Sequence, residues 1–167
     1  MLTMKRLDAM DARILLALDD NPNATVLALS RTLGLARNTV HARLTRLTED
    51  GTLKAFSRRV DPAALGYHLV AFISLSVSQT NASTAPDGIR RIPEVIEAHA
   101  TTGDADLLAK VVARDTEDLY RITNDILKID GVVRASTVIS LLEVTPVRLT
   151  ALLEIAARAG RPPSRDD

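Results

Sequence analysis

The sequence contains no cysteine and no tryptophan, and only two tyrosines and two phenylalanines. The absence of cysteine excludes disulfides and thiolate metal sites and fits a reducing compartment. Because aromatic side chains are scarce, a core must be built from Leu, Val, Ile and Ala, and 46% of the residues are hydrophobic. No apolar run approaches the roughly 18 residues of a membrane span, and acids interrupt the N-terminal stretch, unlike a signal peptide. We therefore expect a cytoplasmic protein that does not associate with a membrane.

The sequence also has no net charge, but its charges are unevenly distributed. Residues 1–60 contain ten Lys/Arg and six Asp/Glu, a net charge of +4, whereas residues 61–167 contain eleven and fifteen, a net charge of −4. A basic first part of a neutral chain indicates a polyanionic partner, although a basic solvated surface is the simpler alternative.

Three helices are expected in the first sixty residues. Asp8 and Thr25 are candidate N-caps for the first and second helices, Gly34 is a stop signal for the second, and a third should run from Arg37 to Glu49. Two short helices joined in this way predict a helix-turn-helix. The apolar positions expected in the core are Ile14, Leu15 and Leu18, then Val26, Leu29 and Leu33, then Val40, Leu44 and Leu47.

The polar side of the third helix suits contact with DNA, because its residue types bond to phosphates and base edges in the major groove. Arg37 to His41 should point deepest into the groove. Residues 52–60 alternate loosely and predict a two-stranded wing that carries further bases. The candidate DNA-binding residues are Thr25, Arg37, Asn38, Thr39, His41, Arg43, Arg46, Lys54, Arg58 and Arg59.

The remaining residues predict a β-α-β-β-α-β order, the ferredoxin-like arrangement, so that the whole chain is of the α+β class. The strands carry little charge on either face, which favours a sheet buried by self-association. The expected elements are a strand over 69–77, a polar loop over 79–86, a helix over 88–93, strands over 95–101 and 106–113, a helix opened by the acids of 115–118, a strand over 132–144, a last helix over 146–159 and a disordered end over 160–167.

Five stretches carry a resemblance to a known family. They are LDAMDARILLALDDN, LSRTLGLARNTVHARLTRLTEDGTLKAF, VDPAALGYHLVAF, IPEVIEAHATTGDADLLAKVVARD and ILKIDGVVRASTVISLLEV. In this order and spacing, over roughly residues 7–145, the chain resembles the Lrp/AsnC, or feast/famine, group of transcription regulators. Together with the pattern, the resemblance divides the chain into a winged helix-turn-helix over 1–60, a linker over 61–68 and an effector-binding and oligomerisation domain over 69–145. The pattern alone adds a helix and tail over 146–167.

The resemblance also implies partners for each domain. Such proteins dimerise through their C-terminal sheets, often assemble into tetramers or octamers, and bind double-stranded DNA with paired winged helices. Many bind an amino acid between C-terminal domains, beside a Gly-Asp-x-Asp turn, which here is Gly103-Asp104-Ala105-Asp106. The implied effector-binding residues are His99, Thr101, Thr102, Gly103, Asp104, Asp106, Leu107, Leu108 and Thr137.

The chemistry of this turn fits a ligand site. Gly103 permits close backbone approach, turn N–H groups can meet a carboxylate, and Asp104 or Asp106 can meet an ammonium group. The alternative is that Gly-Asp is an ordinary tight-turn pair.

The chain departs from the family pattern at three places. Ala36 and Arg37 replace the Ser-Pro pair common at the start of the recognition helix, which puts base preference in doubt; an Ala in place of a capping Ser costs about 1 kcal/mol of helix stability. Ala105 stands where a larger residue is usual, so the pocket is reshaped. The residues beyond Pro146 pass the usual end of the domain.

An enzyme is the alternative from a different class, because a branch with this two-domain layout decarboxylates sirohaem. That branch carries a His- and Tyr-containing stretch and a strand like Asn-Leu-Trp-Phe, whereas this chain has no tryptophan. Its three histidines lack the spacing of metal ligands, and no Gly-rich phosphate loop is present. We therefore predict no catalytic site, metal or cofactor. A sensing or assembly module without DNA binding is a third alternative, which the basic first sixty residues disfavour.

Overall fold

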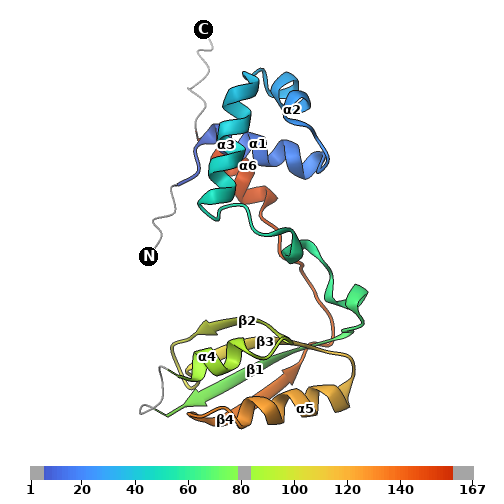
Figure 1. The fold of residues 1–167 in the computed structure, drawn as a ribbon, viewed down its shortest axis with the longest axis vertical. Helices are drawn as coiled ribbons and strands as arrows, with labels where there is room; N and C mark the ends of the chain where they lie inside the picture. Colours follow the sequence, from blue (N-terminus) through green and yellow to red (C-terminus); the bar gives the residue numbers. More distant parts are fainter. Residues whose placement is uncertain (1–5, 79–83, 160–167) are drawn as a thin grey trace. The chain divides into compact units, whose positions relative to one another are not determined.

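The computed structural model describes residues 6–78 and 84–159, which form two compact units (Figure 1). A helical unit contains the described residues up to Arg58 and those from Thr145 onward, and a sheet unit spans Arg59–Val144. The predicted disordered end, 160–167, and residues 79–83 of the predicted loop lie outside the described residues.

Three helices at the start of the helical unit confirm the predicted pattern: α1 (Ala9–Asp20), α2 (Val26–Leu33) and α3 (Arg37–Glu49). The side chains of Asp8 and Thr25 accept hydrogen bonds from first-turn N–H groups, as N-caps do. Gly34 ends α2 in the left-handed conformation, at φ 66°. Ala36 leaves α3 without a side-chain cap.

Ser30 fixes the turn between α2 and α3. Its hydroxyl donates to the carbonyl of Leu35 at 2.7 Å, and the Leu35 N–H donates back to the Ser30 carbonyl at 3.0 Å. Ser30 is nearly buried, so both of its polar groups need these partners. A short polar residue inside α2 therefore sets how the chain leaves α2 and enters α3.

A further helix, α6 (Thr150–Arg158), packs against α1 in the helical unit. Its side chains at Leu153, Ala156 and Ala157 are half-buried, and the Thr150 hydroxyl donates to the Asp19 carboxylate at 3.0 Å. The segment expected as a separate addition after the sheet domain thus completes the helical unit. The helical unit is built from both ends of the chain.

No strand forms in residues 52–60, so the predicted two-stranded wing is wrong for the described structure. A short 3-10 helix, η1 (Phe56–Arg59), occupies part of this stretch. An isolated two-stranded ribbon is marginal in water unless it packs on something, and Phe56, the largest apolar residue available for packing, is 77% exposed.

The sheet unit confirms the β-α-β-β-α-β order. After a 3-10 turn, η2 (Pro62–Leu65), its elements are β1 (Leu69–Val77), α4 (Ala85–Arg90), β2 (Val95–Ala100), β3 (Leu107–Ala113), α5 (Thr116–Leu127) and β4 (Val132–Ile139). The strands form one antiparallel sheet in the order β2-β3-β1-β4. The buried side chains of α4 and α5 share one core with the sheet, so both helices cover the same face (Figure 1).

Two predicted boundaries in this unit are wrong. Helix α4 begins at Ala85, inside the expected loop, with Pro86 in its first turn, where proline is favoured. Strand β4 ends at Ile139, not at residue 144, because it pairs only with β1 and Ile139 already faces Ala71 near the start of β1. The Ser140 N–H still donates to the Val70 carbonyl at 2.8 Å, but residues 142–144 lie beyond the start of β1 at Leu69.

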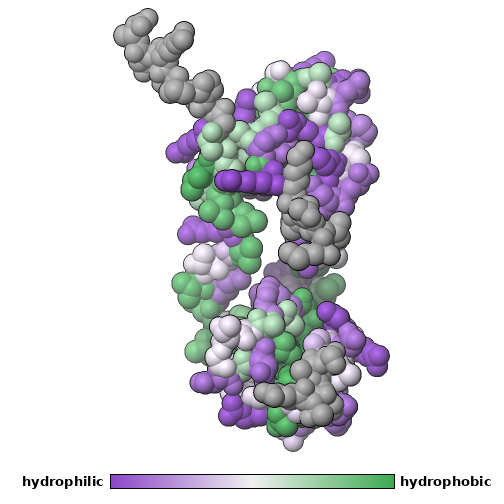
Figure 2. Space-filling view, turned by 90° about the vertical axis from the view of Figure 1, so that its left-hand side faces the viewer, coloured by the Kyte–Doolittle hydropathy of each residue, from purple (hydrophilic) through white to green (hydrophobic). Residues whose placement is uncertain are grey.

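Apolar side chains also reach the surface of each unit (Figure 2). Val133 and Val138 of β4 are exposed in the sheet unit, as are Leu152 and Ile155 of α6 in the helical unit. Within 6–78 and 84–159, no helix combines the length and apolar character needed to cross a membrane.

Replacing Leu153 by Ala should destabilise the helical unit by about 1 kcal/mol, because α6 packs on α1 and a half-buried leucine of α6 loses apolar contacts. The neighbouring Leu152→Ala, at a side chain that is 62% exposed, is the matched control and should change stability by less than about 0.5 kcal/mol. Urea unfolding followed by far-UV circular dichroism measures both. Equal effects of the two substitutions would contradict the packing of α6 on α1.

The sheet unit should lose stability in acid through Asp118. Hydrogen bonds from the Arg114 N–H and the Arg121 guanidinium hold the pKa of Asp118 below its usual value. A lowered native pKa stabilises the fold at pH values above the unfolded-state pKa of about 3.9, and this stabilisation disappears as the pH falls through the native pKa. Asp118→Asn should therefore be less stable at pH 7 and show a shallower decline below about pH 4 in thermal melts. A decline as steep as that of the unsubstituted protein would exclude this role.

Candidate functional site

The first turns of α3 present a continuous polar surface. Arg37, Asn38, Thr39 and His41 are all exposed, while Val40 between them is fully buried. The buried apolar side therefore holds the helix in the unit while the opposite side faces outward. Arginine, asparagine and histidine side chains on such a helix can bond to base edges and phosphates.

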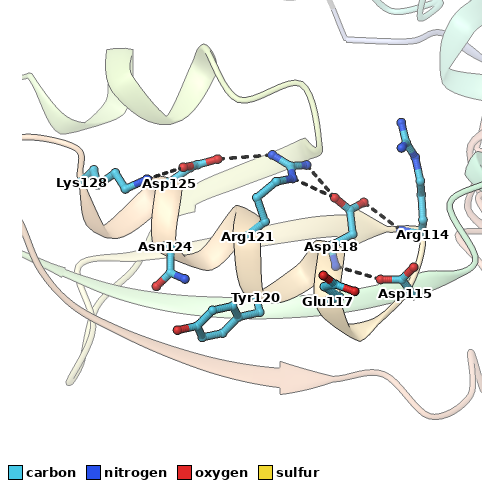
Figure 3. Close-up of a pocket in the computed structure, with 9 residues that line it drawn as sticks. All are labelled: Arg114, Asp115, Glu117, Asp118, Tyr120, Arg121, Asn124, Asp125 and Lys128. Atoms are coloured by element: carbon cyan, nitrogen blue, oxygen red, sulfur yellow. Dashed lines mark hydrogen bonds and ion pairs between the residues drawn. The ribbon is translucent and has the colours of Figure 1, made fainter.

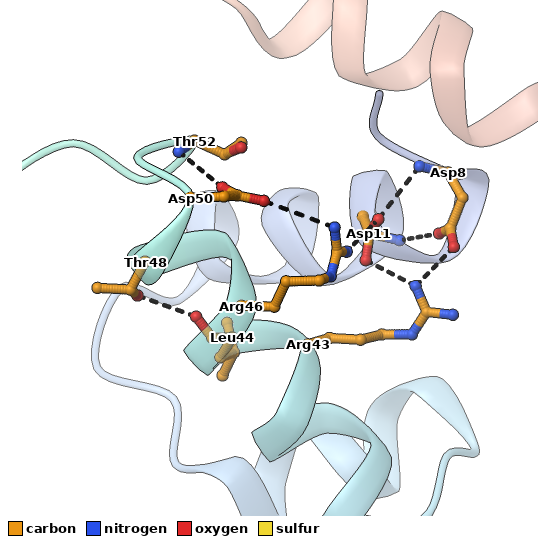
Figure 4. Close-up of polar contacts among 8 residues, drawn as sticks. All are labelled: Asp8, Asp11, Arg43, Leu44, Arg46, Thr48, Asp50 and Thr52. Atoms are coloured by element: carbon orange, nitrogen blue, oxygen red, sulfur yellow. Dashed lines mark hydrogen bonds and ion pairs between the residues drawn. The ribbon is translucent and has the colours of Figure 1, made fainter. Parts of the chain in front are cut away.

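Arg43 and Arg46 of α3 lie against the start of α1 (Figure 4). Nη1 of Arg43 lies 2.7 Å from Asp8 Oδ2 and 2.6 Å from Asp11 Oδ1, and Nη2 of Arg46 lies 2.6 Å from Asp11 Oδ2. The hydrogen bonds to Asp8 and Asp11 raise the pKa of Arg43 above its usual value. Carboxylates within the helical unit already bind these two arginines, so a phosphate would compete with them, and the predicted phosphate contacts of Arg43 and Arg46 stay a prediction.

Asp8, Asp11, Arg43 and Arg46 form a charged cluster. Its two acids, Asp8 and Asp11, lie in different environments. The Asp11 side chain is 1% exposed, and that of Asp8 is 55% exposed. Partial burial opposes ionisation of Asp8, but hydrogen bonds from Arg43 and the Asp11 N–H outweigh it and lower the pKa of Asp8. Sequence reasoning missed this cluster, although acids three residues apart on α1 and arginines three residues apart on α3 were a usable signal.

A surface hollow of the helical unit opens beside this cluster. It is lined by Arg6, Asp8, Asp11, Asn38, Thr39, Ala42, Arg43 and Arg46. The hollow therefore brings the acidic start of α1 next to Asn38 and Thr39, two of the predicted DNA contacts.

The other predicted DNA contacts are exposed but separate from this hollow. Thr25 is the N-cap of α2, and its hydroxyl oxygen accepts from the Ala28 N–H at 3.1 Å. Lys54 and Arg58 follow α3 in the helical unit, whereas Arg59 is the first residue of the sheet unit.

The predicted effector turn lies between β2 and β3. Gly103 adopts φ 118°, a conformation that residues with a Cβ rarely adopt. The Thr101 hydroxyl donates to the Ala105 carbonyl at 2.7 Å, and the Asp106 carboxylate accepts from the Val77 N–H at 2.8 Å. Asp106 thus ties the turn to the end of β1, while Thr102 and Asp104 are exposed at its tip.

The structure does not bring all the predicted effector residues together within one chain. His99 pairs with Leu108 across β2 and β3, whereas Thr137 pairs with Ile73 across β1 and β4. Residues paired across an antiparallel sheet share a face, so Thr137 lies on the helix-covered face with Ile73. Leu107 also lies there, because it pairs with the buried Leu75. His99 and Leu108 lie on the opposite face.

A second hollow, on α5, contains none of the predicted site residues (Figure 3). Its charges largely satisfy one another: the Arg121 guanidinium contacts Asp118, Asp125 and Glu94, and Lys128 contacts Asp125. Hydrogen bonds to Asp118 and Glu94 raise the pKa of Arg121. In the part of the chain that the structure describes, no group of three or more His, Asp or Glu side chains could hold a metal ion.

Two family models match the two kinds of domain. Residues 7–54 match a winged helix-turn-helix DNA-binding model, and residues 70–149 match the Lrp/AsnC ligand binding domain.

Relatives of known type match most of the chain. The HTH-type transcriptional regulator FL11 of Pyrococcus horikoshii is 35% identical over 81% of this chain and 89% of its own length. The HTH-type transcriptional regulator AldR of Mycolicibacterium smegmatis is 40% identical over 75% of each chain. The structure of E. coli AsnC superposes with a TM-score of 0.78 at 27% identity, covering 87% of this chain and 99% of AsnC.

FL11 and AldR are named as transcriptional regulators, so the sirohaem-decarboxylase alternative is not favoured. The helix-turn-helix and the four-stranded sheet unit agree with the two matched domain models. The chain belongs to the Lrp/AsnC family of transcription regulators and is a DNA-binding regulator with a domain that senses a small molecule.

Proposed function

We propose that this regulator contacts the bases of its operator with the first turns of α3, and that an amino acid bound beside the Gly103–Asp106 turn of assembled chains controls this binding. The observation that carries the proposal is the exposed run Arg37, Asn38, Thr39 and His41 on a helix anchored by the fully buried Val40 and Leu47.

The exposed run offers groups that discriminate between bases. An asparagine amide can pair with adenine N6 and N7, and an arginine guanidinium with guanine O6 and N7. Asn38 and Arg37 are therefore proposed as base contacts, with Thr39 and His41 beside them. Thr25, Lys54, Arg58 and Arg59 are exposed and are proposed to contact phosphates, which position the protein without reading sequence.

A homodimer is proposed because one face of the sheet lacks helices. Phe72 pairs with Val138, and Ser74 with Ser136, on the face opposite the buried Ile73 and its helices. Phe72 and Val138 are 39% and 63% exposed, which favours burial against the same face of a second copy in a two-fold interface. Tetramers or octamers are proposed as further assemblies of such dimers.

The proposed effector site also needs more than one chain. Thr137 on β4 and His99 on β2 occupy opposite faces and opposite edges of the sheet, about 14 Å apart at three strand spacings. A ligand site that includes both Thr137 and His99 therefore has to take them from different copies of the chain. Asp104 is the proposed partner of the ligand ammonium group, and N–H groups of the turn are the proposed partners of its carboxylate.

An amino acid is the proposed effector class. The transcriptional regulator NMB0573 of Neisseria meningitidis, 26% identical with a TM-score of 0.74, was solved as a complex with L-Met. The same fold in this chain carries the glycine turn at Gly103, which supports the transfer of this ligand class.

Fluorescence anisotropy with a labelled fragment of the upstream DNA tests the DNA half of the proposal. Asn38→Ala should lower the preference for the operator over a base-substituted operator by about five- to fiftyfold, because it removes one base contact of roughly 1–2 kcal/mol. The matched control is Thr48→Ala on the exposed last turn of α3, which should leave the preference unchanged. An unchanged preference in Asn38→Ala shows that the assigned face is wrong.

The effector half is tested by repeating the titration with each of the twenty amino acids at two salt concentrations, with sedimentation to follow assembly. One amino acid should shift both DNA affinity and oligomer size, as coupled sites require. Gly103→Ala should abolish the shift, because a Cβ strains a backbone at φ 118°. Gly131→Ala, at φ 92° in the turn before β4, places similar strain elsewhere in the sheet unit and should keep the shift. If no amino acid changes either property, the effector proposal fails while the DNA proposal stands.

A further inference from the structure

We propose that Asp8 and Asp11 determine DNA specificity by holding Arg43 and Arg46 in an electrically neutral cluster, which limits the affinity of the recognition helix for DNA of any sequence. The proposal rests on the assignment of the exposed side of α3 as the DNA-binding surface.

Every strong contact of the two arginines is to an acid of the same unit. Nη1 of Arg43 binds both Asp8 and Asp11, and Nη2 of Arg46 binds Asp11, all within 2.7 Å. Asp50 adds a longer ion pair to Arg46 at 3.7 Å. Charge-assisted hydrogen bonds as short as those to Asp8 and Asp11 are among the stronger ones in proteins. The two guanidinium charges are therefore balanced before DNA arrives.

The cluster also lies where DNA is proposed to approach. The hollow that contains both acids and both arginines is lined by Asn38 and Thr39 as well, and Arg6 is its remaining charged residue. Asp8 is the more accessible acid, with 55% of its side chain exposed. A phosphate beside Asn38 thus meets Arg6 and a neutral cluster with an exposed carboxylate, not two further free arginines.

Neutralisation changes the balance between specific and non-specific binding. Each phosphate that a base neutralises releases counterions and lowers the slope of log K against log salt by about 0.9, whatever the sequence. α3 carries three arginines, and the cluster engages two of them. Base contacts from Arg37 and Asn38 then contribute a larger share of the total affinity, which raises the ratio of operator to non-operator binding.

Asp8→Asn is the decisive variant. Asparagine caps a helix about as well as aspartate, so α1 keeps its start, while the cluster gains a net charge of +1 beside Arg43. Asp20→Asn at the far end of α1, about 18 Å along the helix axis, is the matched control with the same change in net charge.

Anisotropy titrations with the operator and with an unrelated duplex, over a series of salt concentrations, give the readout. Asp8→Asn should bind the unrelated duplex about three- to tenfold more tightly at low salt, with a salt slope steeper by up to about one. Its ratio of operator to non-operator affinity should fall by a similar factor. Asp20→Asn should change the affinity for the unrelated duplex by less than twofold. The double variant Asp8→Asn/Arg43→Gln removes the extra charge and should return to the affinity of the unsubstituted protein.

Three results would overturn the proposal: Asp8→Asn indistinguishable from Asp20→Asn, weaker binding by Asp8→Asn, or a gain that persists in the double variant. Circular dichroism verifies the fold of each variant, and Asp8→Ser, another uncharged N-cap, replaces Asp8→Asn if its helix content falls. Failure of the unsubstituted protein to bind DNA in a salt-sensitive way would instead contradict the DNA-binding surface itself. The two failures are therefore distinguishable.

Discussion

The buried carboxylate of Asp11 is the contact on which the geometry of the helical unit depends. It completes the capping box of α1 by accepting the Asp8 N–H, and it binds two arginines of α3 with its two oxygens. A buried charge is costly unless every lone pair finds a donor, so the carboxylate tolerates few arrangements of its partners. The ion pairs of Asp11 with Arg43 and Arg46 consequently fix the position of α3 against α1, in addition to the apolar packing of the helical unit.

The sheet unit contains a similar arrangement, in which an arginine binds an acid at the start of a helix. Helix α5 also starts with two aspartates three residues apart, Asp115 and Asp118, and Arg121 binds the second. Arg121 also reaches Glu94, which precedes β2, at 2.6 Å. In each unit a charged helix start is therefore joined to a separate segment by an arginine. In the helical unit the arginines come from the proposed recognition helix, so only there does the pairing remove charge from a functional surface.

Local sequence signals predicted the helices well because the signals themselves are local. The caps at Asp8 and Thr25 and the stop at Gly34 depend on neighbours within a turn, and all three hold in the structure. The order and type of the elements in the sheet unit followed from periodicity for the same reason.

What the sequence did not show concerns contacts between distant residues. The end of β4 is set by where its partner β1 begins, and a strand in residues 52–60 would need something to pack against. The partners of Arg43 lie more than thirty residues away on α1, so the helical pattern of α3 placed it on a polar side without showing what faced it. The register that puts Thr137 and His99 on opposite faces likewise appears only when the strands are paired.

The location of α6 has a consequence for the order in which the protein folds. Residues 59–144 form a loop between α3 and the segment that leads to α6, and closing an unstructured loop of that length carries an entropic cost that grows with the logarithm of its length. Once the sheet unit has folded, the start of β1 and the end of β4 are paired side by side. Most of the entropy of loop closure has then already been lost. On a ribosome α1 to α3 emerge first and α6 last, so the DNA-binding unit is completed only after the sensing unit has been made.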